Sequence, residues 1–583
     1  MQASESQQAA PMILFFFAVA LVFVGNAFLL HGSSMMSSLS SSTSAAVTTT
    51  PTDNEKNDSN IRTVSSSASE NIMTQSTATA AAATTVGAAQ QASNNSTCKK
   101  SLSKYRALLW PGRRSISMSP SCTFSKRLRS RSGSFSGNTQ VIGPMPSLQP
   151  PSASSCPEMA AWRVACKQWL FWDPNPHTRE VVTGWLKTGD EQTATKLLLG
   201  KRLAFGTSGL RGKMGAGYGR MNDLVVIQTT QGLCRYLEKE GGEEFKKRGV
   251  LIGHDHRAQV GVSSEGFARL AAAVFASRGF KVYFLSGTMA TPIVAFGVSH
   301  LNACAGLMVT ASHNPKLDNG YKVYWGNGSQ IIPPHDTGIA SSIRQNLEPW
   351  QTYNVASAIS GPNCSDTVET LAKAYFQGIG DKLCRRPKAN ACSDLEVVYS
   401  AMHGVGDAWA KRAFAAFSLP PLISVDCQRL PDPDFPTLQY PNPEEQGALK
   451  EAIRLAEDRG VSLVLANDPD ADRLAAAERQ PSGEWHVFSG NEIGVLLGVW
   501  QWEEWRRTHP SEDPSKAVMI ASTVSSKMLS AVANKEGFRF EETLPGFKWM
   551  GHRAQELKIL ILPSKSGERS GRETAQMNIT LGM

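Results

Sequence analysis

The chain has 583 residues, room for three or four domains, and carries 59 lysines and arginines against 50 aspartates and glutamates. Many basic residues lie between positions 99 and 131 among serines and glycines with few aromatics, which indicates a solvated tail and argues against nucleic-acid binding. The 10 cysteines form no Cys-x-x-Cys pair, which argues against a zinc finger or disulfide framework and fits the reducing cytosol.

The N-terminal extension, residues 1–155, differs in character from the rest. Residues 12–30 are almost wholly apolar and about long enough to cross a bilayer, but no lysine or arginine precedes them as in a secretory signal. They are either a signal anchor or part of an extension that the working protein lacks. In the second case the working protein would start at Met159. Residues 31–155 are rich in serine, threonine and alanine, which predicts disorder. We expect a cytoplasmic protein, with anchoring through residues 12–30 as the alternative.

From Met159 onward, helical and buried-strand patterns alternate. Asp173-Pro174-Asn175-Pro176 ends a first helix, and Thr291-Pro292 opens a later one with proline near its first turn. Helical periodicity is found at 264–278, and apolar runs predict strands at 250–253, 281–285 and 306–310. This βαβαβ order predicts an α/β fold with a mostly parallel sheet and helices on both faces.

The α/β pattern then recurs twice. The second round has a helix at 445–459 and strands at 395–402, 422–425 and 461–465. The third round has helices at 525–535 and 549–557 and strands at 518–521, 538–543 and 559–562. The sequence therefore predicts three consecutive α/β units after the extension.

Ser312 follows an apolar strand and precedes His313-Asn314-Pro315. A turn or capping serine is the alternative, but Pro315 limits the freedom of the loop. We expect Asp318-Asn319-Gly320 to form a turn that folds the chain back and returns Lys322 toward the serine. A hydroxyl, an imidazole and an ammonium at one rim suit a nucleophile with proton-transfer groups.

Three aspartates at every second residue follow another buried strand: Asp468, Asp470 and Asp472. A surface acidic turn is the alternative, whereas an EF-hand is excluded because Arg473 and Arg479 occupy its sixth and twelfth positions. Carboxylates this close repel one another unless a cation joins them. In open α/β sheets ligands bind beyond the carboxyl ends of strands, where both Ser312 and Asp468 lie. Together they predict a phosphoryl-transfer site with Mg²⁺ beside the serine.

Two glycine-containing segments are weaker candidates for phosphate contacts. A glycine-rich loop contains Thr207, Ser208 and Arg211, and such loops are usually only turns. Its exposed amides and the arginine would suit phosphate oxygens. Gly546 and Lys548 lie where a strand leads into a helix, and a helix N-terminus attracts phosphate.

Three stretches resemble the α-D-phosphohexomutases, the phosphoglucomutase and phosphomannomutase superfamily: ASHNPKLDNGYKVYWGNG (311–328), ANDPDADRLAAAE (466–478) and EETLPGFKWMG (541–551). The chain is most similar to the phosphoglucomutase-2 and phosphopentomutase group, which includes glucose-1,6-bisphosphate synthase. The resemblance implies three-layer α/β domains: domain I at 156–348, domain II at 370–482 and a partial domain III at 486–563. The tail at 564–583 resembles nothing in the family, so we expect the third domain to be partial and the fourth to be absent, with an open sheet edge in domain III and weak activity.

The resemblance also implies roles for the candidate residues. Ser312 is similar to the phosphoserine that donates and takes back phosphate, His313 and Lys322 to acid/base groups, and Arg211 to an active-site contact. The implied Mg²⁺ ligands are the Ser312 phosphate, Asp468, Asp470 and Asp472. The implied substrate-binding residues are Thr207, Ser208, Asn314, Arg473, Gly546 and Lys548.

The activity implied by the resemblance is an intramolecular phosphoryl transfer. It interconverts the 1-phosphates and the 5- or 6-phosphates of ribose and glucose through a sugar bisphosphate, with glucose-1,6-bisphosphate as activator. The implied partners are phosphosugars, bound by a monomer. Asn314-Pro315-Lys316 favours a mutase, whereas Leu544-Pro545-Gly546 favours the bisphosphate synthase, the first alternative. A non-catalytic protein that binds metal and phosphosugar is the second.

Overall fold

The computed structural model describes residues 160–559 and 578–580. The apolar segment at 12–30, the region expected to be disordered and nearly all of the strand expected at 559–562 lie outside these residues. Among the helices within them, none is both long and apolar enough to span a bilayer.

Short helices precede the first sheet: α4 (Ala161–Trp172), α5 (Pro176–Thr188), α6 (Glu191–Ala194) and the π-helix η2 (Thr195–Leu199). The predicted end of the first helix is confirmed. The Asn175 side chain accepts hydrogen bonds from the backbone N–H groups of His177 and Thr178, and Pro176 begins α5. Trp169 is fully buried and packs edge-on against Tyr218, so α4 is held against the first domain.

The first sheet has six strands in the order β1-β7-β6-β2-β5-β8. Strands β6, β2, β5 and β8 are parallel, and β7 and β1 continue the sheet antiparallel, so the mostly parallel sheet is confirmed. The three expected strands lie within one residue of their predicted ends. The bounds are β1 (Leu210–Lys213), β2 (Val250–His254), β5 (Val282–Phe284), β6 (Ala305–Val309), β7 (Asp318–Trp325) and β8 (Cys364–Asp366), with a separate hairpin of β3 (Ala258–Gln259) and β4 (Val262–Ser263).

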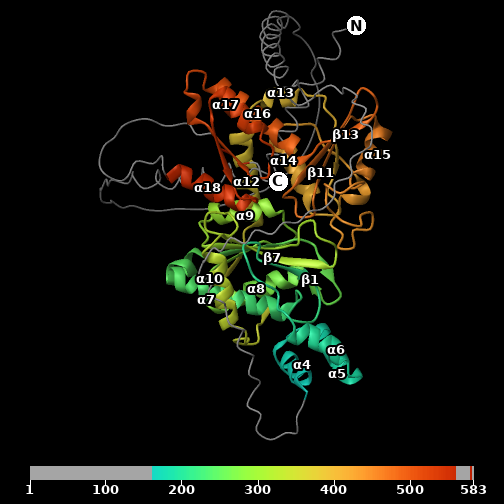
Figure 1. The fold of residues 1–583 in the computed structure, drawn as a ribbon, viewed down its shortest axis with the longest axis vertical. Coiled ribbons are helices and arrows are strands. Elements are labelled where there is room, and N and C mark those ends of the chain that lie inside the picture. Colours follow the sequence, from blue (N-terminus) through green and yellow to red (C-terminus); the bar gives the residue numbers. More distant parts are fainter. Residues whose placement is uncertain (1–159, 560–577, 581–583) are drawn as a thin grey trace, which may run out of the picture. The chain divides into compact units, whose positions relative to one another are not determined.

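Helices cover both faces of the first sheet. Helix α8 (Ser264–Ser277) and helix α9 (Thr291–His300) pack against β2 and β6 from opposite sides (Figure 1). Both helices were predicted, and Ser263 caps the first of them. Helix α7 (Asp223–Arg248) lies between α8 and α10 (His335–Gln345), and α11 (Val355–Ile359) also contacts α8. Strand β2, which leads to the site, is buried at every residue.

Asp318-Asn319-Gly320 does not form the predicted turn. These residues open β7, where Gly320 pairs with Arg211 of β1, and the chain reverses earlier, at 312–317. Gly320 permits close packing instead, because a Cβ there would lie 2.5 Å from the Thr310 carbonyl oxygen. Lys322 still returns toward the serine loop, but it does so along a strand.

The second sheet has the order β10-β9-β11-β12-β13, with the first three strands parallel and the last two antiparallel. The helix expected from 445 begins only at Lys450, because Gly447 has a φ of +83° and interrupts any helix there. The strands are β9 (Val398–Ser400), β10 (Ile423–Ser424), β11 (Leu463–Asn467), β12 (Leu474–Arg479) and β13 (Trp485–Val487). The helices are α12 (Val368–Leu383), α13 (Pro387–Ala391), α14 (Gly406–Ala416), the 3₁₀ turn η3 (Asp426–Gln428) and α15 (Lys450–Arg459).

The third sheet has the order β15-β14-β16, and all three strands are parallel. An open sheet edge was expected in this unit, but β16 (Asn578–Thr580), which belongs to the tail, pairs with β14 (Val518–Ser522) there. The reason is general: an unpaired edge offers backbone N–H and C=O groups to any extended segment within reach. The other elements are α16 (Gly490–Thr508), η4 (Pro514–Lys516), α17 (Met528–Glu536), β15 (Arg539–Thr543) and α18 (Phe547–Ile559).

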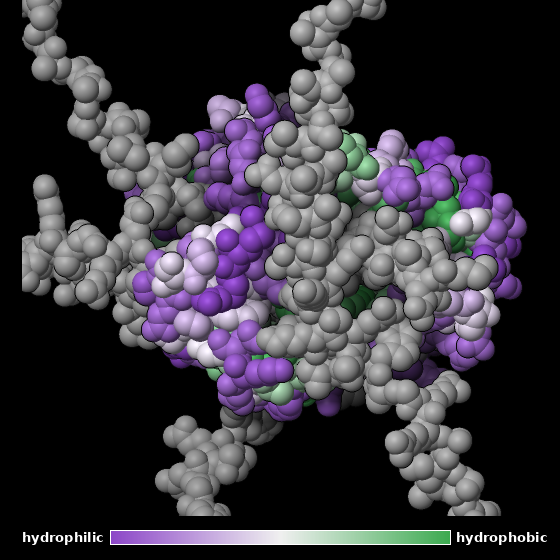
Figure 2. Space-filling view, turned by 90° about the horizontal axis from the view of Figure 1, so that it is seen from above, coloured by the Kyte–Doolittle hydropathy of each residue, from purple (hydrophilic) through white to green (hydrophobic). Residues whose placement is uncertain are grey.

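Each sheet has its own cluster of buried apolar side chains. On the face shown in Figure 2, most of the coloured surface is hydrophilic. The three clusters confirm three α/β units, each built around one sheet.

Candidate active site

The loop that carries Ser312, here called the serine loop, consists of residues 310–317 between β6 and β7. Ser312 is almost fully buried and has a φ of +53°, a left-handed conformation that is uncommon for a residue with a side chain. Its backbone N–H donates to Thr310 Oγ1 at 2.9 Å. A residue held in this conformation requires support from its surroundings, and such residues cluster at functional sites.

The loop that carries the three aspartates consists of residues 468–473 between β11 and β12, and is called the metal loop after its expected role. One oxygen from each of Asp468, Asp470 and Asp472 lies within 4.8 Å of the others. Asp468 is completely buried, and its Oδ1 accepts hydrogen bonds from the backbone N–H groups of Asp472 and Arg473. Ala471 has a φ of +54°, which lets the chain fold tightly enough for the alternate aspartates to converge.

The two loops meet although they are 156 residues apart in the chain: Ser312 Oγ donates to Asp468 Oδ2 at 2.6 Å. This contact joins the first sheet to the second at the carboxyl ends of β6 and β11. That position beyond strand ends is where open α/β sheets bind ligands.

Lys322 lies between the other two aspartates. Its Nζ donates to Asp470 Oδ2 at 2.6 Å and to Asp472 Oδ2 at 3.0 Å. Burial disfavours the ammonium, but the charges of Asp470 and Asp472 outweigh it and raise the pKa of Lys322 above its usual range. Thr291 also reaches Asp470: its Oγ1 donates to Oδ2 at 2.7 Å, and its backbone N–H donates to the Asp470 carbonyl oxygen.

The aspartates fit a hard divalent cation. Asp470 Oδ1 is buried and, within the described part of the chain, has no hydrogen-bond partner. Burial and the neighbouring carboxylates raise the pKa of Asp468 well above its usual range, whereas Lys322 overcomes burial and lowers that of Asp470. Three converging carboxylates, one with a free buried oxygen, are the oxygen donors that Mg²⁺ prefers.

The imidazole of His313 lies beside the serine hydroxyl, with Nδ1 at 3.4 Å from Ser312 Oγ. Burial, followed by the positive charges of Arg473 and Arg211, lowers the pKa of His313 to about 4. The imidazole is therefore neutral at neutral pH and has a nitrogen lone pair available to accept a proton.

Arg211 and Asn314 contact each other at the rim of the serine loop. Arg211 Nη1 donates to Asn314 Oδ1 at 2.9 Å, and Asn314 Nδ2 donates to Asp318 Oδ2 at 3.0 Å. Two candidates from separate stretches of sequence are thus brought to the same loop.

The glycine-rich loop reaches α18. Lys548 Nζ donates to Thr207 Oγ1 at 2.6 Å, and Gly546, with a φ of +107°, directly precedes the helix. A Cβ on Gly209 would lie 1.8 Å from the Tyr321 carbonyl oxygen, so this loop lies against β7 one residue from Lys322. Ser208 is in the same turn, and within residues 160–559 no hydrogen bond links its side chain to another candidate.

Sequence reasoning missed two residues that contact these loops, Thr291 and Arg257. The buried guanidinium of Arg257 donates to backbone oxygens of the serine loop. A signal was present, because Asp255 and Arg257 directly follow the buried strand β2, the same position that singled out Ser312.

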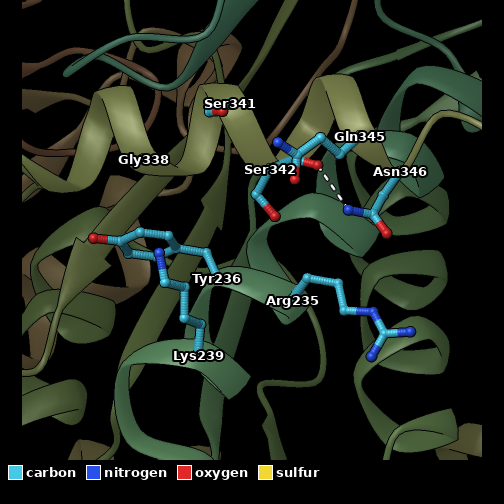
Figure 3. Close-up of a pocket in the computed structure, with 8 residues that line it drawn as sticks. All are labelled: Arg235, Tyr236, Lys239, Gly338, Ser341, Ser342, Gln345 and Asn346. Atoms are coloured by element: carbon cyan, nitrogen blue, oxygen red, sulfur yellow. Dashed lines mark hydrogen bonds between the residues drawn. The ribbon is translucent and has the colours of Figure 1, made fainter.

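Neither of the two pockets described contains one of the candidate residues. Figure 3 shows the first, of about 510 Å³, between α7 and α10, where Asn346 Nδ2 donates to the Ser342 carbonyl oxygen. The second, of about 710 Å³, lies against the outer side of the serine loop at Pro315–Asp318 and the segment 434–440. The candidate site is therefore defined by its side-chain contacts.

Comparison with known proteins points in one direction. Residues 202–349 match the family model of the phosphoglucomutase/phosphomannomutase alpha/beta/alpha domain I, and residues 373–483 match domain II. Phosphopentomutase of Mus musculus is 52% identical over 395 residues (67% of this chain and 63% of that protein), and its Homo sapiens counterpart is 50% identical over 412 residues (70% and 67%). Glucose 1,6-bisphosphate synthase of Homo sapiens is 45% identical over 399 residues (67% and 64%).

The chain thus spans about two thirds of the length of these relatives, 63% to 67%. Among solved structures, a phosphoglucomutase/phosphomannomutase family protein from Burkholderia thailandensis has a TM-score of 0.45 and 18% identity. That match covers 61% of this chain and 68% of the other.

Proposed function

Because the chain belongs to the phosphoglucomutase/phosphomannomutase family, we propose that it is a phosphosugar mutase that uses Ser312 as its phosphate carrier. The observation that supports this best is the 2.6 Å contact between Ser312 Oγ and Asp468 Oδ2. It puts a hydroxyl nucleophile beside three carboxylates suited to a divalent cation.

The proposed reaction exchanges one phosphoryl group in two steps. A sugar hydroxyl attacks the phosphate on Ser312, the bond between phosphorus and Oγ breaks, and a sugar bisphosphate forms. The serine hydroxyl then attacks the other phosphate of that bisphosphate, so the sugar leaves with its phosphate moved. Each attacking hydroxyl loses a proton, and each leaving oxygen gains one.

Two side chains suit these proton transfers. The neutral His313 imidazole, 3.4 Å from Ser312 Oγ, is suited to accept a proton. Lys322 is the second candidate, and because Asp470 and Asp472 hold its ammonium in the charged form, it is better suited to stabilise negative charge than to donate a proton. Arg211, Asn314, Arg473, Lys548 and the loop around Thr207 would then contact the substrate's phosphate and hydroxyl groups.

Mg²⁺ is the proposed metal, held by Asp468, Asp470 and Asp472 with the serine phosphate. When bound, it would offset the negative charge of the transferring phosphoryl group. Glucose-1,6-bisphosphate is the proposed activator, since it could transfer a phosphoryl group to Ser312 when that serine is not phosphorylated.

The proposed substrates are ribose and glucose phosphates. The two phosphopentomutases are 52% and 50% identical to the chain, against 45% for the bisphosphate synthase, which favours the mutase. The synthase remains the second candidate because Leu544-Pro545-Gly546 resembles it. Within the described residues the seven cysteines are all free, which supports our proposal of a reducing, cytoplasmic setting.

The test uses the full chain with Mg²⁺ and glucose-1,6-bisphosphate. We expect mass spectrometry to find phosphate on Ser312, and ribose 1-phosphate to be converted to ribose 5-phosphate. Ser312→Ala should abolish both, whereas Ser365→Ala, at an exposed serine of β8, should leave both unchanged. Conversion that persists in Ser312→Ala would rule out the proposed carrier. A phosphorylated serine that passes phosphate only to sugar monophosphates, yielding bisphosphate, would favour the synthase.

A further inference from the structure

Arg257 holds the serine loop by its backbone. Its Nη1 donates to the carbonyl oxygens of Pro315 and Asp318, at 2.9 and 3.1 Å. Its Nη2 donates to those of Ser312 and Asn314, at 2.6 and 2.7 Å. One guanidinium therefore satisfies four carbonyl groups, three of them in the serine loop and the fourth on Asp318, the first residue of β7.

The guanidinium is itself fixed in place. Arg257 and Asp255 are both completely buried, with 3.4 Å between Arg257 Nε and Asp255 Oδ2. Asp255 Oδ1 accepts hydrogen bonds from Ser264 Oγ and the Arg257 backbone N–H. A buried ion pair is a costly way to stabilise a fold. Its presence beside a loop in which Ser312 has an unusual positive φ points to a role in holding that loop.

The second domain closes over this guanidinium. The ring centroid of Phe435 lies 5.2 Å from the Arg257 guanidinium carbon and 5.3 Å from the His256 ring. Phe435 is 2% exposed and comes from the segment after Asp432, whose backbone N–H donates to the His403 carbonyl oxygen. Val405, two residues after His403, donates its backbone N–H to the Pro469 carbonyl oxygen of the metal loop. The segment 403–405 therefore supports both Phe435 and the metal loop.

We propose that Arg257 is a positioning residue for phosphoryl transfer, which holds the serine loop so that Ser312 Oγ faces Asp468, and that Phe435 locks it from the second domain. The catalytic consequence rests on the proposed mutase function, but the hold on the loop does not. Misplacing a reacting atom by about 1 Å can cost on the order of 100-fold in rate, so a side chain that binds four carbonyl groups around Ser312 is a sensitive point.

The loop is tested by hydrogen exchange of the full chain. Removing Arg257 should speed exchange of the amides in 311–318 by at least about tenfold and leave β2 and β6 unchanged. Arg257→Met is compared with Asp255→Asn/Arg257→Met, which leaves no unpaired carboxylate. The control is Arg248→Met, because Arg248 donates to the carbonyl oxygens of Asn302 and Ala303 before β6, outside the serine loop. Unchanged exchange in 311–318, or an equal rise throughout the first sheet, would overturn the proposal.

Two milder variants keep the test decisive if Arg257→Met does not fold. Arg257→Lys retains the charge but cannot reach four carbonyl groups with one ammonium. Phe435→Leu changes no residue of the first domain and removes only a ring that packs against Arg257 and His256. We expect both to speed exchange in 311–318, with a smaller effect for Phe435→Leu. If neither does, the lock is refuted.

The catalytic part is tested by the rate at which glucose-1,6-bisphosphate phosphorylates Ser312. Arg257→Lys should lower this rate about 10- to 100-fold, with KM and Mg²⁺ affinity changed by less than about threefold, because the ligands are untouched. If the wild-type protein is never phosphorylated, the proposed function fails while the exchange result still decides the loop. If the wild type is active and Arg257→Lys matches it, the positioning role fails.

Discussion

Asp470 is the residue on which the candidate metal site depends most directly. Its Oδ2 is occupied by Lys322 and Thr291, and its Oδ1 is buried without a partner in the described residues. Such an oxygen is costly unless something charged binds it. We therefore expect Asp470→Asn to weaken Mg²⁺ binding by at least about tenfold, measured by titration calorimetry with Mg²⁺ alone.

Asp426→Asn is the matched control for this change. Asp426 is 94% exposed, and among the residues that the structure describes its one ion-pair partner is Arg429. The substitution removes the same charge without touching the cluster, so Mg²⁺ affinity should stay within about twofold. Equal affinities for the two variants would show that Asp470 is not a metal ligand.

At the level of single residues, sequence reasoning found the groups whose chemistry is written in their own side chains. Ser312 and Asp468 follow recognisable apolar strands, Lys322 was expected to return toward the serine, and the structure brings all three together. Arg257 was missed although it follows the buried strand β2, because its partners are backbone carbonyl groups, which every residue has and which leave no sequence pattern of their own. Contacts of that kind can be found only from coordinates.

At the level of elements, the glycine-rich loop depends on one close approach. Gly209 has a φ of +71°, and a Cβ on it would meet the Tyr321 carbonyl oxygen of β7. Gly279 has a similar φ, +78°, with nothing within 4 Å of its Cβ position. Substitution of Gly279 by alanine therefore measures the cost of the positive φ alone. Substitution of Gly209 measures that cost together with the clash against the Tyr321 carbonyl oxygen.

We expect Gly279→Ala to lower the free energy of unfolding by about 1–2 kcal/mol and Gly209→Ala by at least about 3 kcal/mol. Chemical denaturation of the two variants and the wild type measures both. Because the loop carries Thr207, Gly209→Ala should also disturb the contact with Lys548. If the two variants are equally stable, the loop does not lie against β7 as described.

Elements with strong local signals were predicted well, and those set by neighbours were not. The buried runs that became β2 and β6 and the Thr291-Pro292 start of α9 needed no tertiary information. Asp318-Asn319-Gly320 has turn composition, yet it is a strand because residues 211–213 of β1 pair with it. Likewise, β16 exists because of its pairing with β14, a partner far away in the chain.

At the level of the whole molecule, the site is complete only when domains meet. Ser312, Lys322 and Thr291 of the first domain all contact aspartates of the second. Lys548 of the third domain donates a hydrogen bond to Thr207 of the first domain. The second and third are themselves joined by buried Glu504 of α16, which binds Arg386. Metal binding to the aspartates of the second domain should therefore change hydrogen exchange in the first domain.

Thr291 provides a direct test of that coupling, because it opens α9 in the first domain and makes two hydrogen bonds to Asp470 in the second. We expect Mg²⁺ to slow hydrogen exchange at the N-terminus of α9. Thr291→Val keeps the backbone bond but loses the hydroxyl, worth about 1 kcal/mol, so the slowing should shrink about fivefold. Thr230→Val removes a buried hydroxyl that bonds only within the first domain and should leave it intact. If Mg²⁺ binds but α9 is unaffected, or both variants respond alike, the domains are not coupled through this contact.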